Sequence, residues 1–248
     1  MQATLKQGRE MRVTAEHFAS CYRLLRESFA SVELDSESSI LADLVGQTEL
    51  KRASQYLMLA RTGSPDDSDS VISLIAGCYL RLDTAEFDGQ GIGFIEYLVT
   101  RRAFRQHGYA GSLLSRFEYE MQQIAASRGE RLRLILGEVE PELMPFKRKR
   151  GYRWPMGSHY AQPPVAFDPL TGVPLTAEVP KRIMVQSWGM PIHSRLLSSA
   201  VEVVFRERYL PRDFERQAAL NAETYIMERI YAPFVASLVS EGDHIVLT

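Results

Sequence analysis

A strand, a glycine-bearing turn, a helix and a second strand follow one another between residues 91 and 139, and this run constrains the fold most. The segments GIGFIEYLVT at 91–100 and RLRLILGEV at 131–139 are apolar and rich in strand-forming residues. Between them, apolar residues recur at the spacing of one helix face: Leu113, Leu114, Phe117, Met121 and Ile124. This order predicts a crossover unit with the two strands in one sheet.

The remaining segments predict antiparallel neighbours for these two strands. We expect helices at 14–30 and 38–50, a hairpin at 55–84 and a short helix at 141–151. Two further strands are expected in YRWPMGSHYAQP and RIMVQSW, with the proline- and glycine-rich link 163–180 between them. The predicted fold is α/β (α+β), with a mixed, mostly antiparallel central sheet flanked by helices.

The composition changes near Trp188, after which two helical patterns occupy residues 192–240. Pro233 is expected to kink or break the second helix. We therefore divide the chain into a main domain at 1–189 and a C-terminal helical extension at 190–248. The extension is expected to pack on the main domain or on another subunit, as in a homodimer formed through these helices.

Composition argues against several classes of protein. The 248 residues carry a formal net charge of −2, so the chain has no general attraction for nucleic acid or acidic membranes. No window reaches the ~18–20 apolar residues of a membrane span, and the first residues lack the apolar core of a secretory signal. We therefore expect a cytoplasmic protein. Cys21 and Cys78 lie far apart and the histidines show no ligand spacing, so neither a disulfide framework nor a metal site is expected.

The turn in FRQHGYAGSLLSRF, residues 104–117, is the main candidate for a binding site. The first turn of a helix has N–H groups without intrahelical partners, and with the helix dipole they attract an anion such as a phosphate. Gly108, Ala110 and Gly111 would let a ligand approach the backbone, and three arginines nearby add positive charge. The turn has neither a P-loop ending nor the dinucleotide fingerprint, and an ordinary turn glycine before a helix is the alternative.

The turn and its neighbours resemble the GNAT superfamily of acyl-CoA-dependent N-acetyltransferases. RQHGYA at 105–110 matches that family's Q/R-x-x-G-x-G/A loop. GFIEYLVTRRAF at 93–104 resembles its fourth strand, LRLILGEV at 132–139 its fifth, and PFKRKRGY at 145–152 the segment usually written FYxxxGF. The order of the elements also fits over roughly residues 10–188, so the resemblance implies a GNAT-like fold.

The resemblance also implies acetyl-CoA as co-substrate and a direct attack of an amine on its thioester. Backbone groups of Leu98, Val99 and Thr100 would bond the pantetheine arm, and an N–H near Leu98 would donate to the oxyanion. Glu96 would take the proton of the amine, although a glutamate on the solvated face of a strand is the alternative. The loop that binds the CoA pyrophosphate would comprise Arg105, Gln106, His107, Gly108, Tyr109, Ala110, Gly111 and Ser112.

One part of the family pattern is missing. Lys147 stands at the position of the usual tyrosine and Glu140 at that of the usual asparagine. Lys147 could protonate the departing CoA thiolate, stabilise it, or be a charge that faces solvent; Tyr152 and Tyr160 are alternative donors. The basic run KRKRGYR at 147–153 favours a solvated helix end or a contact to the 3′-phosphate of CoA over a nucleic-acid site.

Three functions are therefore considered. The first is an N-acetyltransferase for a small-molecule or peptide amine, the second a non-catalytic acyl-CoA-binding protein, and the third an N-acyltransferase that uses a longer acyl-CoA. In a GNAT-like fold, residues 27–45 and 155–181 would wall the acceptor site. Glu33, Asp35 and Glu37 in the first wall would suit a cationic amine. The second wall holds Tyr160, Gln162, Phe167 and Asp168.

Overall fold

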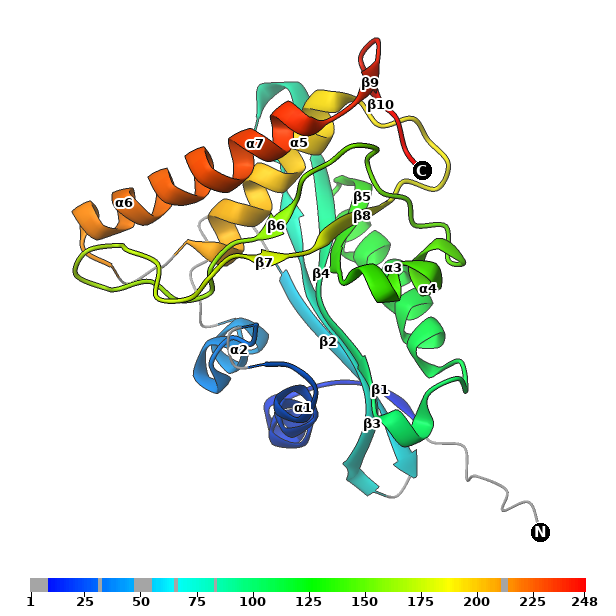
Figure 1. The fold of residues 1–248 in the computed structure, drawn as a ribbon. Helices are drawn as coiled ribbons and strands as arrows, with labels where there is room; N and C mark the ends of the chain where they lie inside the picture. The colour runs from blue at the N-terminus through cyan, green and yellow to red at the C-terminus, as the bar shows by residue number, and fades with distance from the viewer. Residues whose placement is uncertain (1–8, 31–32, 47–54, 65–66, 83, 211–213) are drawn as a thin grey trace. The chain divides into compact units, whose positions relative to one another are not determined.

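The computed structural model describes residues 9–30, 33–46, 55–64, 67–82, 84–210 and 214–248. A six-stranded sheet has the order β1-β2-β3-β4-β5-β8 (Figure 1). β4 and β5 run parallel, whereas β1–β2, β2–β3 and β5–β8 pair antiparallel, which confirms the predicted mixed sheet and its crossover unit. The strands are Glu10–Arg12 (β1), Gln55–Ser64 (β2), Asp67–Arg81 (β3), Gln90–Thr100 (β4), Arg131–Val139 (β5) and Arg182–Gln186 (β8).

The chain forms two compact units. Unit 1 combines the described residues of 1–79 with 95–131, and unit 2 combines those of 80–94 with 132–248. Residues 190–248 thus share a unit with 132–189, and their separation at 189/190 stays a prediction. Within the described ranges, no helix is both long and apolar enough to cross a membrane.

In unit 1, helices α1 (Ala15–Ser28) and α2 (Glu37–Leu44) lie on one side of the hairpin β2–β3 and α3 (Tyr109–Ser127) on the other (Figure 1). The hairpin and α1 match their predictions. The α2 helix begins where the Ser36 hydroxyl accepts the Ser39 N–H at 3.2 Å, and it is shorter than predicted. Residues 47–50 of that prediction lie outside the described residues.

Both cysteines are buried in unit 1, as packing residues of α1 and β3. Burial raises the pKa of Cys21 to about 12, so its thiol stays protonated and unreactive at neutral pH.

In unit 2, α5 (Ser194–Val204) continues into a π-helical turn at Phe205–Tyr209. A second helix runs from α6 (Arg216–Ile226) through the π turn Met227–Tyr231 into α7 (Ala232–Ser237), so it does not break at Pro233. The π turn lies just before Pro233. In a regular α-helix the proline ring would clash with a backbone carbonyl of the preceding turn, and the wider π turn relieves this clash. The Tyr231 hydroxyl donates to the Ser198 carbonyl at 3.3 Å and ties the two helices together.

The prediction of a strand in YRWPMGSHYAQP is mostly wrong. Only β6 (Ala161–Gln162) is extended in a ladder, and it pairs with β7 (Val179–Pro180). Pro155 cannot donate a ladder hydrogen bond and Gly157 has a φ of 72°, which explains why no longer strand forms. Arg153 forms an isolated antiparallel bridge with Val185 of β8, and the extension supplies the next neighbour, because the Trp154 and Thr248 backbones exchange hydrogen bonds of 3.2 and 3.0 Å.

Short elements complete the two units. They are Arg102–Phe104 (η2) in unit 1 and, in unit 2, Ala85–Phe87 (η1), Pro141–Leu143 (η3), Met144–Arg148 (α4), Ser240–Glu241 (β9) and His244–Ile245 (β10).

The link at 163–180 is docked on α6 within unit 2. Asn221 Nδ2 donates to the Thr171 carbonyl at 2.8 Å, and the Tyr225 hydroxyl donates to Glu178 at 2.7 Å. Gly172 has a φ of 72°, and a Cβ added there would lie 2.1 Å from the Ala218 carbonyl oxygen. Only glycine therefore permits this close approach of the link to the helix.

We expect Gly172→Ala to lower the free energy of unfolding by about 3 kcal/mol, because strain at positive φ adds to a clash with backbone. Gly242→Ala is the matched control, since Gly242 has a φ of 60° with nothing within 4 Å of its added Cβ. The control should cost only about 1 kcal/mol. Urea denaturation measures both, and equal losses would mean that the docking of the link is not close.

Candidate functional site

The turn before α3 contains two residues in left-handed conformation. Gly108 is the N-cap of α3 with a φ of 83°, and Gln106 has a φ of 67°. A Cβ added to Gly108 would meet no atom within 4 Å, so the backbone conformation, and not internal crowding, requires glycine. A non-glycine residue at positive φ is uncommon, and turns of this kind point successive N–H groups toward one side.

The backbone amides at 106–111 are available to a ligand. The Ser112 N–H makes the first bond of the helix, to the Gly108 carbonyl at 3.0 Å. Across the part of the chain that the structure describes, the amides of residues 106–111 have no acceptor. Residues 105–108 are exposed, so an anion can reach the first of these amides from solvent.

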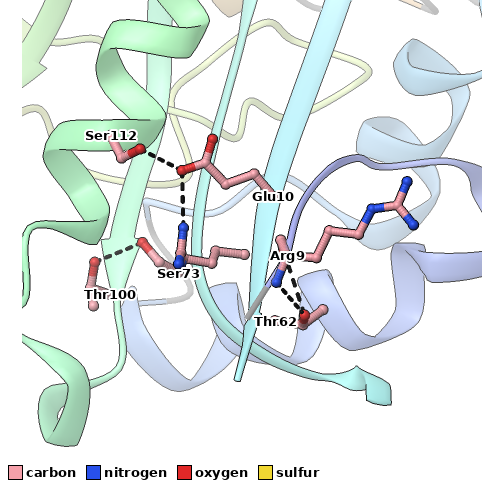
Figure 2. A network of polar contacts seen from close by, with 7 residues as sticks. Arg9, Glu10, Thr62, Ser73, Thr100 and Ser112 are labelled. Carbon is pink, nitrogen blue, oxygen red and sulfur yellow. Dashed lines mark hydrogen bonds and ion pairs between the residues drawn. The ribbon is translucent and has the colours of Figure 1, made fainter. Parts of the chain in front are cut away.

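The first turn of α3 is tied to strands β1 and β2 by a polar network (Figure 2). The Ser112 hydroxyl donates to the Glu10 carboxylate at 2.5 Å, and Arg61 pairs with Glu10 at 3.2 Å. The Arg61 guanidinium also lies 4.7 Å from the centre of the Tyr109 ring, which stacks on His107. These contacts hold the turn in place and leave its amides exposed. Glu10 and Arg61 had no signal in the sequence, because they lie far from the turn along the chain.

The end of β4 is fixed where the turn leaves it. The Ser73 hydroxyl donates to the Val99 carbonyl at 2.9 Å and lies 2.7 Å from the Thr100 hydroxyl (Figure 2). Arg105 Nε donates to the Thr100 carbonyl at 3.2 Å. The Arg105 side chain therefore also links the turn to the end of β4. Ser73 supports the same strand end, and the sequence did not indicate it.

Glu96 is half-buried on β4, and its Oε2 atom is shielded from solvent. The Cys78 thiol lies 3.9 Å from its Oε1 atom, within the range of a weak hydrogen bond. This placement argues against the alternative of a fully solvated strand carboxylate.

Tyr97, next along β4, connects this strand with the start of α2. Its hydroxyl donates to the Asp35 carboxylate and accepts the Asp35 N–H, both at 3.1 Å. Burial, and then the charges of Asp35 and Glu96, raise the pKa of Tyr97, so its phenol stays protonated. Asp35 and Glu96 therefore both lie within electrostatic reach of one hydroxyl. Of the acidic residues predicted in the first wall, Asp35 is thus tied to β4.

The structure contradicts the alternative that the Lys147 side chain faces solvent. It is only 5% exposed, and its ammonium lies 4.6 Å from the centre of the buried Tyr152 ring. The single turn of α4 points this side chain inward, where a cation on an aromatic face is stabilised. A role as proton donor stays a prediction.

The predicted residues of the second acceptor wall have structural partners inside unit 2. The Tyr160 hydroxyl donates to Glu138, and burial followed by the Glu138 charge raises its pKa, so it is a poor proton donor. Phe167 packs edge-on against Tyr225, and Gln162 is buried on β6. Asp168 accepts the amides of residues 170 and 171 at 2.9 Å, which lowers its pKa. Among the described residues, no group of three or more His, Cys, Asp or Glu could hold a metal ion.

The fold is similar to GNAT acetyltransferases of known structure, as the sequence resemblance implied. A Bacteroides thetaiotaomicron protein assigned to the GNAT family matches with a TM-score of 0.55 and 18% identity, over 82% of this chain and 99% of its own. NAA60 from Arabidopsis thaliana, solved with a bisubstrate analogue, matches with a TM-score of 0.52 and 14% identity, over 72% and 97%. No protein-family model and no curated protein matches the sequence. The chain thus has a GNAT-like fold.

Proposed function

We propose that this protein is an acetyl-CoA-dependent N-acetyltransferase that acts on a primary amine of a small molecule or peptide. The observation that supports it most is the run of amides at 106–111, which begins on the exposed residues 106–108 at the start of the 19-residue helix α3. Among the described residues, these amides have no acceptor. The strand that leads into this turn carries the half-buried Glu96. An anion site and a carboxylate on consecutive elements are what acyl transfer from a CoA thioester needs.

The chain's own residues would hold the cofactor through its charged and polar parts. The amides at 106–111 would bind the pyrophosphate, with Arg105 beside them. Backbone groups of Leu98, Val99 and Thr100 would bond the pantetheine arm, and the N–H near Leu98 would donate to the oxyanion. When bound, acetyl-CoA supplies the activated acetyl group.

The reaction requires an uncharged amine. Most amines are protonated at neutral pH and have no free electron pair for attack. Glu96 would take one proton from the ammonium group, directly or through water. The amine nitrogen would then bond to the acyl carbon as the carbon–sulfur bond breaks. The second proton lost by that nitrogen would pass to the departing thiolate. Asp35 would help to attract the cationic acceptor, because its carboxylate is bonded to Tyr97, and Tyr97 lies next to Glu96 on β4.

Two measurements test this function. Thermal unfolding with acetyl-CoA, longer acyl-CoAs and free CoA shows which donor stabilises the protein, and release of CoA thiol over a panel of amines shows turnover. We expect stabilisation by acetyl-CoA and thiol release that depends on the amine. Stabilisation without turnover would favour the non-catalytic acyl-CoA-binding alternative, and preference for a longer chain would favour another N-acyltransferase. No stabilisation by any CoA species would refute all three.

A further inference from the structure

Unit 2 contains a pocket of about 390 Å³ formed by four separate parts of the chain, one of which contributes only Pro141. Residues 159–161 and 180–182, on either side of the β6–β7 pairing, form one side. The second π turn and the start of α7 supply Arg229, Ile230 and Pro233. We propose that this pocket binds a small organic anion, meaning a carboxylate or phosphate group carried on an apolar body. The proposal does not depend on acetyl transfer.

The charged side chains that line the pocket are all basic. Lys181, Arg182 and Arg229 line it together with His159, and no carboxylate residue does. Lys181 is neutralised in part by Glu140 at 3.3 Å. Neither Arg182 nor Arg229 pairs with a carboxylate anywhere in the described ranges. Two guanidinium groups at one concave site, each without a counter-ion from the protein, favour an anionic ligand.

The rest of the lining is apolar. Ile230 is buried, and the Tyr160 ring packs against Phe205 and Phe234, with ring centres 5.8 and 5.5 Å apart. The Tyr160 hydroxyl points away to Glu138, so its ring offers an apolar face. A ligand with an apolar body would bury part of its surface on this floor while its anionic group meets the arginines. Inorganic phosphate alone would contact the basic residues and leave the apolar part of the pocket unfilled.

The helical extension has a defined part in this site. Arg229 is exposed and forms neither a hydrogen bond nor an ion pair with any residue that the structure describes, although its charge acts on the Tyr225 hydroxyl. It belongs to the π turn at 227–231, which shifts the helix register just before Pro233. Such turns occur often at functional sites. The second helix of the extension therefore supplies one exposed cation of the pocket, Arg229. Arg182, at the start of β8, supplies another.

The test uses three probes with the same phenyl body: 3-phenylpropionate, phenyl phosphate and the neutral 3-phenylpropanamide. Isothermal titration of the full chain should give both anions a Kd at least about tenfold lower than that of the amide. A preference for one anion over the other identifies the ligand as a carboxylate or a phosphate. Added NaCl should weaken both anions and leave the amide unaffected.

The variant Arg229→Gln should raise the Kd of the preferred anion about tenfold, and Arg229→Glu should abolish binding. Arg216→Gln is the matched control, because Arg216 is exposed on the same helical arm but does not line the pocket. It should bind like the parent protein. Circular dichroism melts check that all variants fold, as expected for exposed side chains. Equal affinity for amide and anions, or an unchanged Kd in Arg229→Gln, would overturn the proposal.

Discussion

Glu96→Gln is expected to lower the turnover number of acetyl transfer by about 100-fold and to leave the Kd for CoA nearly unchanged. The substitution keeps the volume of the half-buried side chain but removes its ability to accept a proton. The acceptor then depends on solvent to lose its proton. The defect should therefore shrink as pH rises toward the ordinary pKa of an amine, about 10, where the acceptor is uncharged without help. Steady-state kinetics from neutral to alkaline pH measure this.

A matched control separates loss of the base from loss of one negative charge. Glu120 lies in the same unit and pairs with Arg116 on α3, so Glu120→Gln removes one carboxylate outside β4. It should keep the parental turnover at every pH. If Glu96→Gln retains full turnover while the parent protein transfers acetyl groups, Glu96 is not the base and the Asp35 region becomes the next candidate.

Local patterns were sufficient for most of the fold. The crossover at 91–139 was predictable because a strand pattern, a helix face of 3.6-residue period and a buried strand follow in order. The predictions that failed depended on partners distant in sequence. The strand expected at 152–163 fails because the Trp154 backbone finds its partner in Thr248, far along the chain. Of the two outcomes expected at Pro233, the break does not occur, because the helix continues through a π turn.

The candidate site was predictable in part, for the same reason. The turn at 104–111 has a local signature, and the amides of residues 106–111 have no acceptor among the described residues. Its use as an anion site stays a prediction. The groups that support it do not have such a signature: Glu10 reaches Ser112 across 102 positions of sequence, and Tyr97 reaches Asp35 across 62. Contacts at this separation depend on strand pairing and helix packing, so no spacing in the sequence reveals them.

Gly108→Val is expected to weaken acetyl-CoA binding about 10- to 100-fold. A β-branched side chain is strained at the observed φ of 83°, so the turn should take another conformation and its amides should no longer converge. The predicted loss corresponds to roughly 1.4 to 2.8 kcal/mol of binding free energy. Because the pyrophosphate contacts lie outside the reacting centre, the turnover number at saturating acetyl-CoA should change far less than KM. Titration calorimetry with CoA measures the affinity directly.

Gly129 provides the control for strain alone. It follows the other end of α3 with a φ of 68°, and a Cβ added there would also meet no atom within 4 Å. Gly129→Val should lose a similar amount of stability in thermal unfolding and bind CoA like the parent protein. If the valine at 108 prevents folding, Gly108→Ala offers a milder form of the same strain. A folded variant at 108 that binds CoA as tightly as the Gly129 control would show that the pyrophosphate binds elsewhere.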